Sequence, residues 1–202
     1  MSYSSDLRSD PIVDDFSQGG GYDFRSRAPM FRLSRFLEPF NLELIPRDEW
    51  RDRIEEKEKT GSQISQLCRK RVKPSNQGQI PYCWAHGVVN TLRCKRAAMG
   101  LSEPVMLEPT AVGAWASGFQ NRGGNSWESV KALAEIGCPT QDFWEPNKID
   151  RRFDTQETKD NARKHRITEW YELGENNFDQ MATCLLLNMP IGGGFMHWGH
   201  LV

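Results

Sequence analysis

Cysteine and histidine are the residue types in this sequence that could carry covalent catalysis. Cys83 stands out among the five cysteines because Pro81 and Tyr82 precede it and an apolar helical pattern follows. The unpaired amides and the dipole at a helix N-terminus favour a thiolate over a thiol. Cys83 is therefore the candidate nucleophile. The other four are expected to be inert thiols: Cys68, Cys94, Cys138 and Cys184.

A thiol nucleophile needs a general base, which can come from a distant part of the chain. The four histidines are the candidates: His86, His165, His197 and His200. His86 follows Cys83 on the same predicted helix, and His165 lies in a charged stretch. His197 and His200 lie at the start of a predicted strand. Spacing alone does not choose among them.

A zinc site is an alternative use of the same residues. Cys83 and His86 form a C-x-x-H pair, and His197 and His200 form an H-x-x-H pair. Helical spacing gives the first pair a shared face, but nothing in the sequence places the second pair beside it. No two cysteines are spaced as C-x-x-C, which weakens the case for structural zinc. We expect no metal, and thiol-based hydrolysis needs no organic cofactor.

The element that must position Cys83 is a core helix. Its residues 84–99 end at Gly100, and Trp84, Val88 and Leu92 recur at the spacing of one helical face. Further helices are predicted at 50–60 before Gly61, from Pro109, at 127–136 with Ser126 as cap, and at 177–188. Strands are predicted at 167–173 and from residue 191 onward.

Length and charge limit the classes of protein to consider. The 202 residues suit one domain plus a tail, or one domain cut short, and we place a flexible leader at 1–43 and the domain at 44–202. The net charge of −1 gives no electrostatic reason to expect nucleic acid or a membrane as partner. The short basic run 69–73 has no interleaved aromatic residues. No apolar run is long enough to span a bilayer, and no signal peptide is visible.

A family resemblance then selects among the histidines. The segment 76–85, NQGQIPYCWA, resembles the active-site segment of papain-like cysteine peptidases, in which N-Q-G-x-C-G-S-C-W-A is usual. Weaker similarities follow the family's order at 72–74, 107–109, 121–124, 143–146 and 199–202. The resemblance covers residues 44–202 and implies an α+β, papain-like fold. That fold has a helical lobe holding Cys83 and the beginning of a β lobe holding His200.

The resemblance also implies roles for individual residues. Cys83 would be the nucleophile and His200 the general base and then acid. Gln77 would donate its side-chain amide to the oxyanion hole, and Gly78 would let the backbone turn behind it. The loop with Gly123 and Gly124 would bind extended peptide. Trp84 would be a core anchor, and the pKa of Cys83 is expected to be depressed when His200 is in place.

Two of the departures from the family pattern bear on the setting and on the site. Ile80 and Pro81 replace the Cys-Gly before the nucleophile, which suits a reducing, cytoplasmic or virion-associated setting. The family orients its histidine with an asparagine in a later N-S-W-G motif, but the given sequence ends two residues after His200. We therefore expect that a missing C-terminal segment or a partner chain completes the site.

The expected activity is hydrolysis of peptide bonds through an acyl-thioester on Cys83, with a protein or peptide as substrate. Two alternatives remain open at this stage. One is a catalytically inactive papain-fold protein used for binding or assembly. The other is a papain-like hydrolase of cell-wall cross-links or isopeptides.

Overall fold

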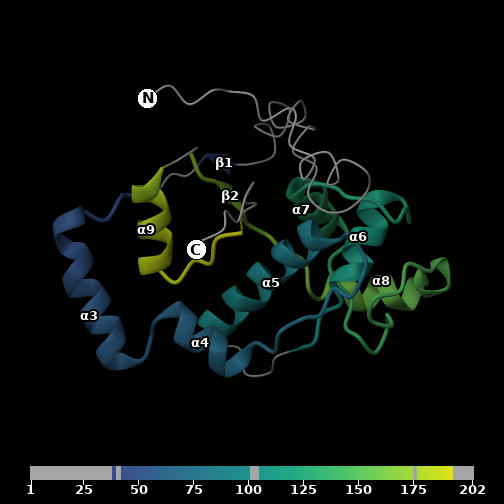
Figure 1. The fold of residues 1–202 in the computed structure, drawn as a ribbon, viewed down its shortest axis with the longest axis horizontal. Helices are drawn as coiled ribbons and strands as arrows, with labels where there is room; N and C mark the ends of the chain where they lie inside the picture. The colour runs from purple at the N-terminus through teal and green to yellow at the C-terminus, as the bar shows by residue number, and fades with distance from the viewer. Residues whose placement is uncertain (1–37, 40–41, 101–104, 175–176, 193–202) are drawn as a thin grey trace, which may run out of the picture.

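The computed structural model describes residues 38–39, 42–100, 105–174 and 177–192, and helices make up most of its regular structure (Figure 1). The helices are α3 (Trp50–Thr60), α4 (Ile64–Arg71), α5 (Cys83–Ala98), α6 (Pro109–Ser117), α7 (Ser126–Glu135), α8 (Gln156–Arg163) and α9 (Phe178–Leu186). Two single turns of 3-10 helix are η2 (Arg47–Glu49) and η3 (Arg151–Phe153). The strands β1 (Glu38–Pro39) and β2 (Tyr171–Glu172) pair in parallel.

Helix α5 runs through the middle of the molecule and contacts α4, α6 and α7 (Figure 1). The helices α6 and α7 gather near its N-terminal end, while α4 lies beside its C-terminal half. Trp84 of the predicted apolar stripe is buried on this helix together with Ala85 and Val89, while Val88 and Leu92 of that stripe are half-buried. The predicted role of Trp84 as a core anchor is thus confirmed.

Two hydrophobic clusters form the core around α5. The first lies at its N-terminal end and contains Tyr82, Trp84, Ala85, Ala111, Ala114 and Trp144. The second lies further along the helix and contains Val89, Leu107, Val112, Ala132, Leu133 and Cys138. Buried apolar area is the main favourable term in folding. The start of α5 is therefore held by the first of these two clusters.

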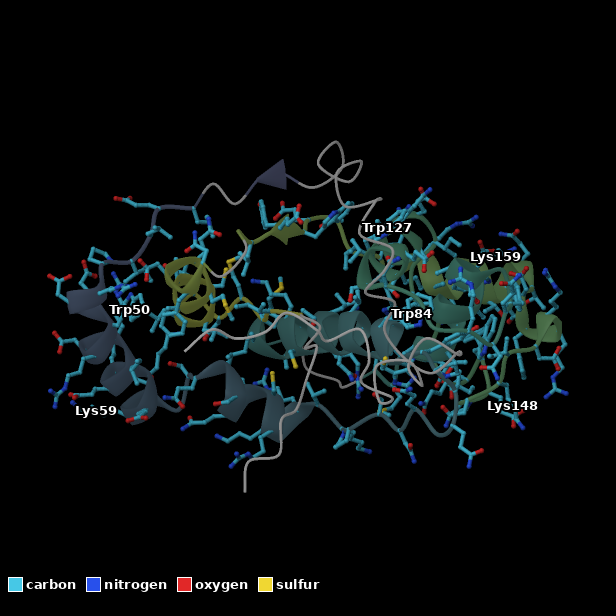
Figure 2. All side chains as sticks on the ribbon, turned by 45° about the horizontal axis from the view of Figure 1, so that its top comes forward. Trp50, Lys59, Trp84, Trp127, Lys148 and Lys159 are labelled. Atoms are coloured by element: carbon cyan, nitrogen blue, oxygen red, sulfur yellow. The ribbon has the colours of Figure 1, made fainter. Side chains whose placement is uncertain are left out.

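The helices α3 and α9 pack against each other at the opposite end of the molecule (Figures 1 and 2). Trp50 meets Phe178 edge to face, with ring centroids 5.7 Å apart. The amide of Ile45 donates to Oγ1 of the buried Thr183 at 3.1 Å. Neither α3 nor α4 has a fully buried residue. This end is consequently held by fewer buried contacts than the start of α5.

Several helix boundaries agree with the sequence-based predictions. Gly61 ends α3 in the left-handed conformation at φ 64°, and Pro109 occupies the first turn of α6. The predicted cap of α7 is wrong, because Asn125 caps this helix in place of Ser126. The Asn125 side chain accepts from the amide of Glu128, whose carboxylate in turn accepts from the amide of Asn125. The sequence analysis also missed α4 and α8.

The prediction of a strand at 167–173 is largely wrong, since only Tyr171–Glu172 is a strand. It pairs with Glu38–Pro39, which belongs to the stretch predicted as a leader. For the α+β prediction, the described residues support the helical part, since they contain many helices and little strand. Most of the strand predicted from residue 191, and the β lobe with it, lies outside the described residues. Among the residues that are described, no helix is both long and apolar enough to cross a membrane.

Candidate active site

Cys83 is the first residue of α5 and is exposed. The carbonyl of Tyr82, just before it, accepts hydrogen bonds from the amides of Ala85 and His86, each at 2.9 Å. The helix therefore begins at the residue that the sequence analysis selected as nucleophile. An exposed thiol at this position is open to a substrate and to reagents.

The pKa of the Cys83 thiol is raised, whereas its position at a helix N-terminus would by itself lower it. Partial desolvation raises this pKa above its ordinary value, while hydrogen bonds from the backbone amides of Trp84 and Cys83 act in the opposite direction. Desolvation is the larger effect, so the thiol form is favoured in the described surroundings. The predicted depression of the pKa depended on His200, which lies outside the described residues.

Tyr82 anchors the start of α5, a role that the sequence analysis missed. Its ring is fully buried and meets Trp84 edge to face, with centroids 5.4 Å apart. Its hydroxyl lies 2.8 Å from Oγ of Ser117 and donates to the carbonyl oxygen of Gln120 at 2.7 Å. The hydroxyl thus ties the residue before Cys83 to the end of α6 and the loop after it. Only the tertiary structure brings these groups together.

Gln77 lies in the loop that leads to Cys83. Its Nε2 donates to the carbonyl oxygen of Ile80 at 2.6 Å. Gly78, at φ 60°, supports the predicted tight turn, and its amide donates to Oδ1 of Asn76 at 2.9 Å. One of the two amide hydrogens of Gln77 therefore fixes the loop. The predicted oxyanion role of Gln77 stays a prediction.

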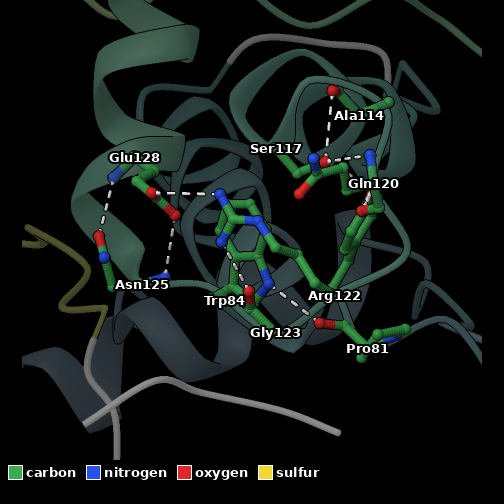
Figure 3. Close-up of polar contacts among 10 residues, drawn as sticks. Pro81, Trp84, Ala114, Ser117, Gln120, Arg122, Gly123, Asn125 and Glu128 are labelled. Atoms are coloured by element: carbon green, nitrogen blue, oxygen red, sulfur yellow. Dashed lines mark hydrogen bonds and ion pairs between the residues drawn. The ribbon is translucent and has the colours of Figure 1, made fainter. Parts of the chain in front are cut away.

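The loop with Gly123 and Gly124 packs against the start of α5 (Figure 3). A Cβ at Gly124 would lie 2.6 Å from Cε2 of Trp84, so glycine is what permits this approach. Arg122 donates from Nη1 to the carbonyl oxygen of Gly123 at 2.9 Å, and its Nη2 lies 3.6 Å from Oε1 of Glu128. The indole Nε1 of Trp84 donates to the carbonyl oxygen of Pro81 at 2.9 Å. Trp84 consequently joins the loop to the segment before Cys83.

The two histidines within the described residues are engaged away from Cys83. Nδ1 of the buried His86 lies 3.3 Å from Oγ of Ser75, and burial followed by the charge of Arg93 lowers its pKa to about 4. His165 is buried and accepts from Arg96 at 3.0 Å. Arg96 lies thirteen residues along α5 from Cys83, a distance of about 20 Å. Neither is therefore placed to act as the base for Cys83.

The zinc alternative gains no support from the described part of the chain. Although helical spacing suggested a shared face for Cys83 and His86, the first is exposed and the second is buried against Ser75. No group of three or more His, Cys, Asp or Glu among the described residues is arranged to hold a metal ion. His197 and His200 lie outside the described residues.

Comparison with known proteins gives one similarity. No family model and no curated protein sequence matches the chain. Among solved structures, the chain is similar to xylellain, a cysteine protease from Xylella fastidiosa, with a TM-score of 0.48 and 16% sequence identity. The similarity covers 56% of this chain and 49% of that one, so it spans about half the length of the xylellain chain.

Proposed function

We propose that this chain belongs to a cysteine-type peptidase whose nucleophile is Cys83. The observation that carries the proposal is the placement of Cys83. It is an exposed thiol at the first position of a core helix, and Tyr82 and Trp84 on either side of it are fixed to the loop 120–124. The sequence around Cys83 resembles the active-site segment of papain-like peptidases, which supports the same assignment.

In the proposed reaction, His200 takes the proton of Cys83, and the sulfur forms a bond to the carbonyl carbon of the peptide. The oxyanion that develops accepts hydrogen bonds from the Cys83 amide and the Gln77 side chain. Preorganised donors of this kind are worth about 3 kcal/mol each. The protonated His200 then gives its proton to the leaving amine as the carbon–nitrogen bond breaks. Water, deprotonated by the same histidine, attacks the acyl-thioester and releases the acid.

The chain itself supplies every group named in this scheme, so the proposal invokes no metal and no organic cofactor. The substrate is a protein or peptide, bound in extended form along Gly123 and Gly124. Nucleic acid and membranes are not proposed as partners. A C-terminal segment or a partner chain would supply the residue that orients His200.

A catalytically inactive papain-fold protein for binding or assembly is the second candidate. One observation favours it: desolvation raises the pKa of Cys83 in the described surroundings. A thiol that stays protonated at neutral pH is a poor nucleophile. A natural protein with an intact Cys83 and no peptidase activity would support this candidate.

The test is labelling of the full natural protein with an acyloxymethyl-ketone or epoxide probe, together with hydrolysis of a fluorogenic peptide. We expect Cys83→Ala to abolish labelling and hydrolysis. The half-buried Cys94 provides the matched control, and Cys94→Ala should keep both. Equal labelling of the two variants would overturn the assignment. Release of cell-wall or isopeptide products without hydrolysis of linear peptides would instead identify the third class considered in the sequence analysis.

A further inference from the structure

Two other cysteines lie together at the contact between α4 and α5. Cys68 is on α4 and Cys94 is on α5, and these helices pack side by side (Figure 1). The Sγ of Cys68 donates to the backbone carbonyl oxygen of Cys94 at 3.9 Å. The Cys94 side chain is also close enough to raise the pKa of the Cys68 thiol. Both thiols are free and half-buried.

The remaining cysteines are not arranged in this way. Cys138 is fully buried, and its Sγ donates to the carbonyl oxygen of Glu108 at 3.4 Å. Cys184 is buried on α9, and Cys83 is exposed at the other end of α5. A disulfide needs the two Cβ atoms to lie about 4 Å apart. Cys68 and Cys94 lie on two helices in direct contact, and Sγ of Cys68 reaches the backbone of Cys94.

We propose that Cys68 and Cys94 form a reversible disulfide that joins α4 to α5 when the protein meets a disulfide oxidant such as oxidised glutathione. Cys94 acts first. Its sulfur bonds to one sulfur of the oxidant, its proton goes to solvent, and one glutathione thiolate leaves. Cys68 then gives its proton to solvent, its sulfur bonds to the Cys94 sulfur of this mixed disulfide, and the second glutathione leaves as a thiolate. Two protein thiols are oxidised and one glutathione disulfide is reduced.

The order of these steps follows from the surroundings of Cys68. Burial, reinforced by the hydrogen bond to Cys94, raises the pKa of Cys68 to about 12. Cys68 is then almost entirely protonated at neutral pH and reacts slowly with a small oxidant in solution. The second step is intramolecular, because Sγ of Cys68 lies 3.9 Å from the backbone oxygen of Cys94, and this proximity offsets the small thiolate fraction. Reduction by excess thiol reverses both steps.

The disulfide would close the segment 68–94, which contains Gln77 and Cys83. Fixing the two ends of this segment removes conformational freedom from the unfolded chain. Oxidation should therefore raise the midpoint of thermal unfolding. The inference does not depend on the proposed peptidase function, because neither sulfur takes part in that chemistry.

The test uses the full chain with Cys83→Ser, which removes the exposed thiol and its own adducts with glutathione. Four thiols remain of the original five. After treatment of the native protein with oxidised glutathione, we expect two free thiols and one cross-linked peptide pair containing Cys68 and Cys94 on digestion without reduction. The unfolding midpoint should rise, and dithiothreitol should restore four thiols and the original midpoint.

Matched variants test the pairing itself. Adding Cys68→Ser or Cys94→Ser should abolish the cross-linked pair and the rise in the midpoint. Cys184→Ser should keep both, with three thiols falling to one. Four thiols remaining after oxidation would overturn the proposal. Glutathione adducts without the Cys68–Cys94 pair, or a different pairing in the folded protein, would overturn it equally.

Discussion

His86 is buried three residues after Cys83, and its pKa of about 4 leaves the ring neutral at neutral and mildly acidic pH. Its Nε2 has no hydrogen-bond partner among the described residues, and its Nδ1 faces Ser75. A charged imidazolium here would lose its hydration and lie near the buried Arg93. His86 is thus a structural residue whose protonation opposes folding.

This arrangement predicts a specific pH dependence of stability. The pKa of His86 is about 4 in the folded protein against 6.5 as the reference value. Above pH 6.5 the ring is neutral in both states. As the pH falls from 6.5 to 4, only the unfolded chain takes up the proton, so the folded state loses up to about 3 kcal/mol. We expect His86→Gln to make the free energy of unfolding fall less steeply over this window, as measured by urea titration at several pH values.

His165 provides the control for that experiment. Burial followed by the charges of Arg96 and Lys164 lowers its pKa as well, so it adds a slope of the same sign. A His165→Gln variant should keep the steep contribution of His86. If His86→Gln left the pH slope unchanged, the neutral, buried state assigned to His86 would be wrong.

At the scale of elements, the contact between α6 and the residue before α5 positions Cys83. A Cβ at Gly113 on α6 would lie 2.3 Å from Cδ2 of Tyr82. The ring of Tyr82 is fully buried and cannot move aside. The close approach of α6 to Tyr82 therefore depends on the absence of a side chain at Gly113.

Two glycine substitutions should consequently have opposite effects. Gly113→Ala would force Tyr82 and α6 apart, and we expect a loss of about 1–3 kcal/mol of stability. Gly87 lies within α5, and a Cβ there meets nothing within 4 Å. Gly87→Ala should gain about 0.5–1 kcal/mol, because alanine favours the helix. Chemical denaturation measures both, and equal effects of the two substitutions would contradict this account of the α5–α6 contact.

At the scale of the whole molecule, packing is uneven along the chain. The two core clusters surround α5, α6 and α7. Helix α9 instead leaves Phe178, Met181 and Leu185 exposed, and α3 buries no residue fully. The α3–α9 end therefore has less buried area opposing local opening.

Hydrogen exchange should reveal this difference. We expect backbone amides of α3 and α9 to exchange about tenfold faster or more than those of α5 and α6, because local opening there exposes fewer buried contacts. Exchange followed by mass spectrometry at the peptide level measures this directly. Uniform protection along α3, α5, α6 and α9 would show that the molecule opens only as one unit.

The sequence by itself determined the features that depend on neighbouring residues. The start of α5 at Cys83, the left-handed cap at Gly61 and the turn at Gly78 follow from short-range hydrogen bonds and allowed backbone angles. The resemblance around Cys83 is likewise contained in one short segment. The positions of the candidate nucleophile and of its helix could therefore be predicted without a structure.

Only the tertiary structure decided which distant groups meet. The Tyr82 hydroxyl reaches Ser117 and Gln120, Gly124 meets Trp84, and the Cys68 thiol reaches the backbone of Cys94. The residues at 167–173 have strand-like composition, yet only two of them pair, because strand formation needs a partner that composition does not specify. The burial of His86 likewise follows from the packing of α5 against the loop with Ser75. Contacts of this kind depend on the arrangement of whole elements, and no local pattern encodes them.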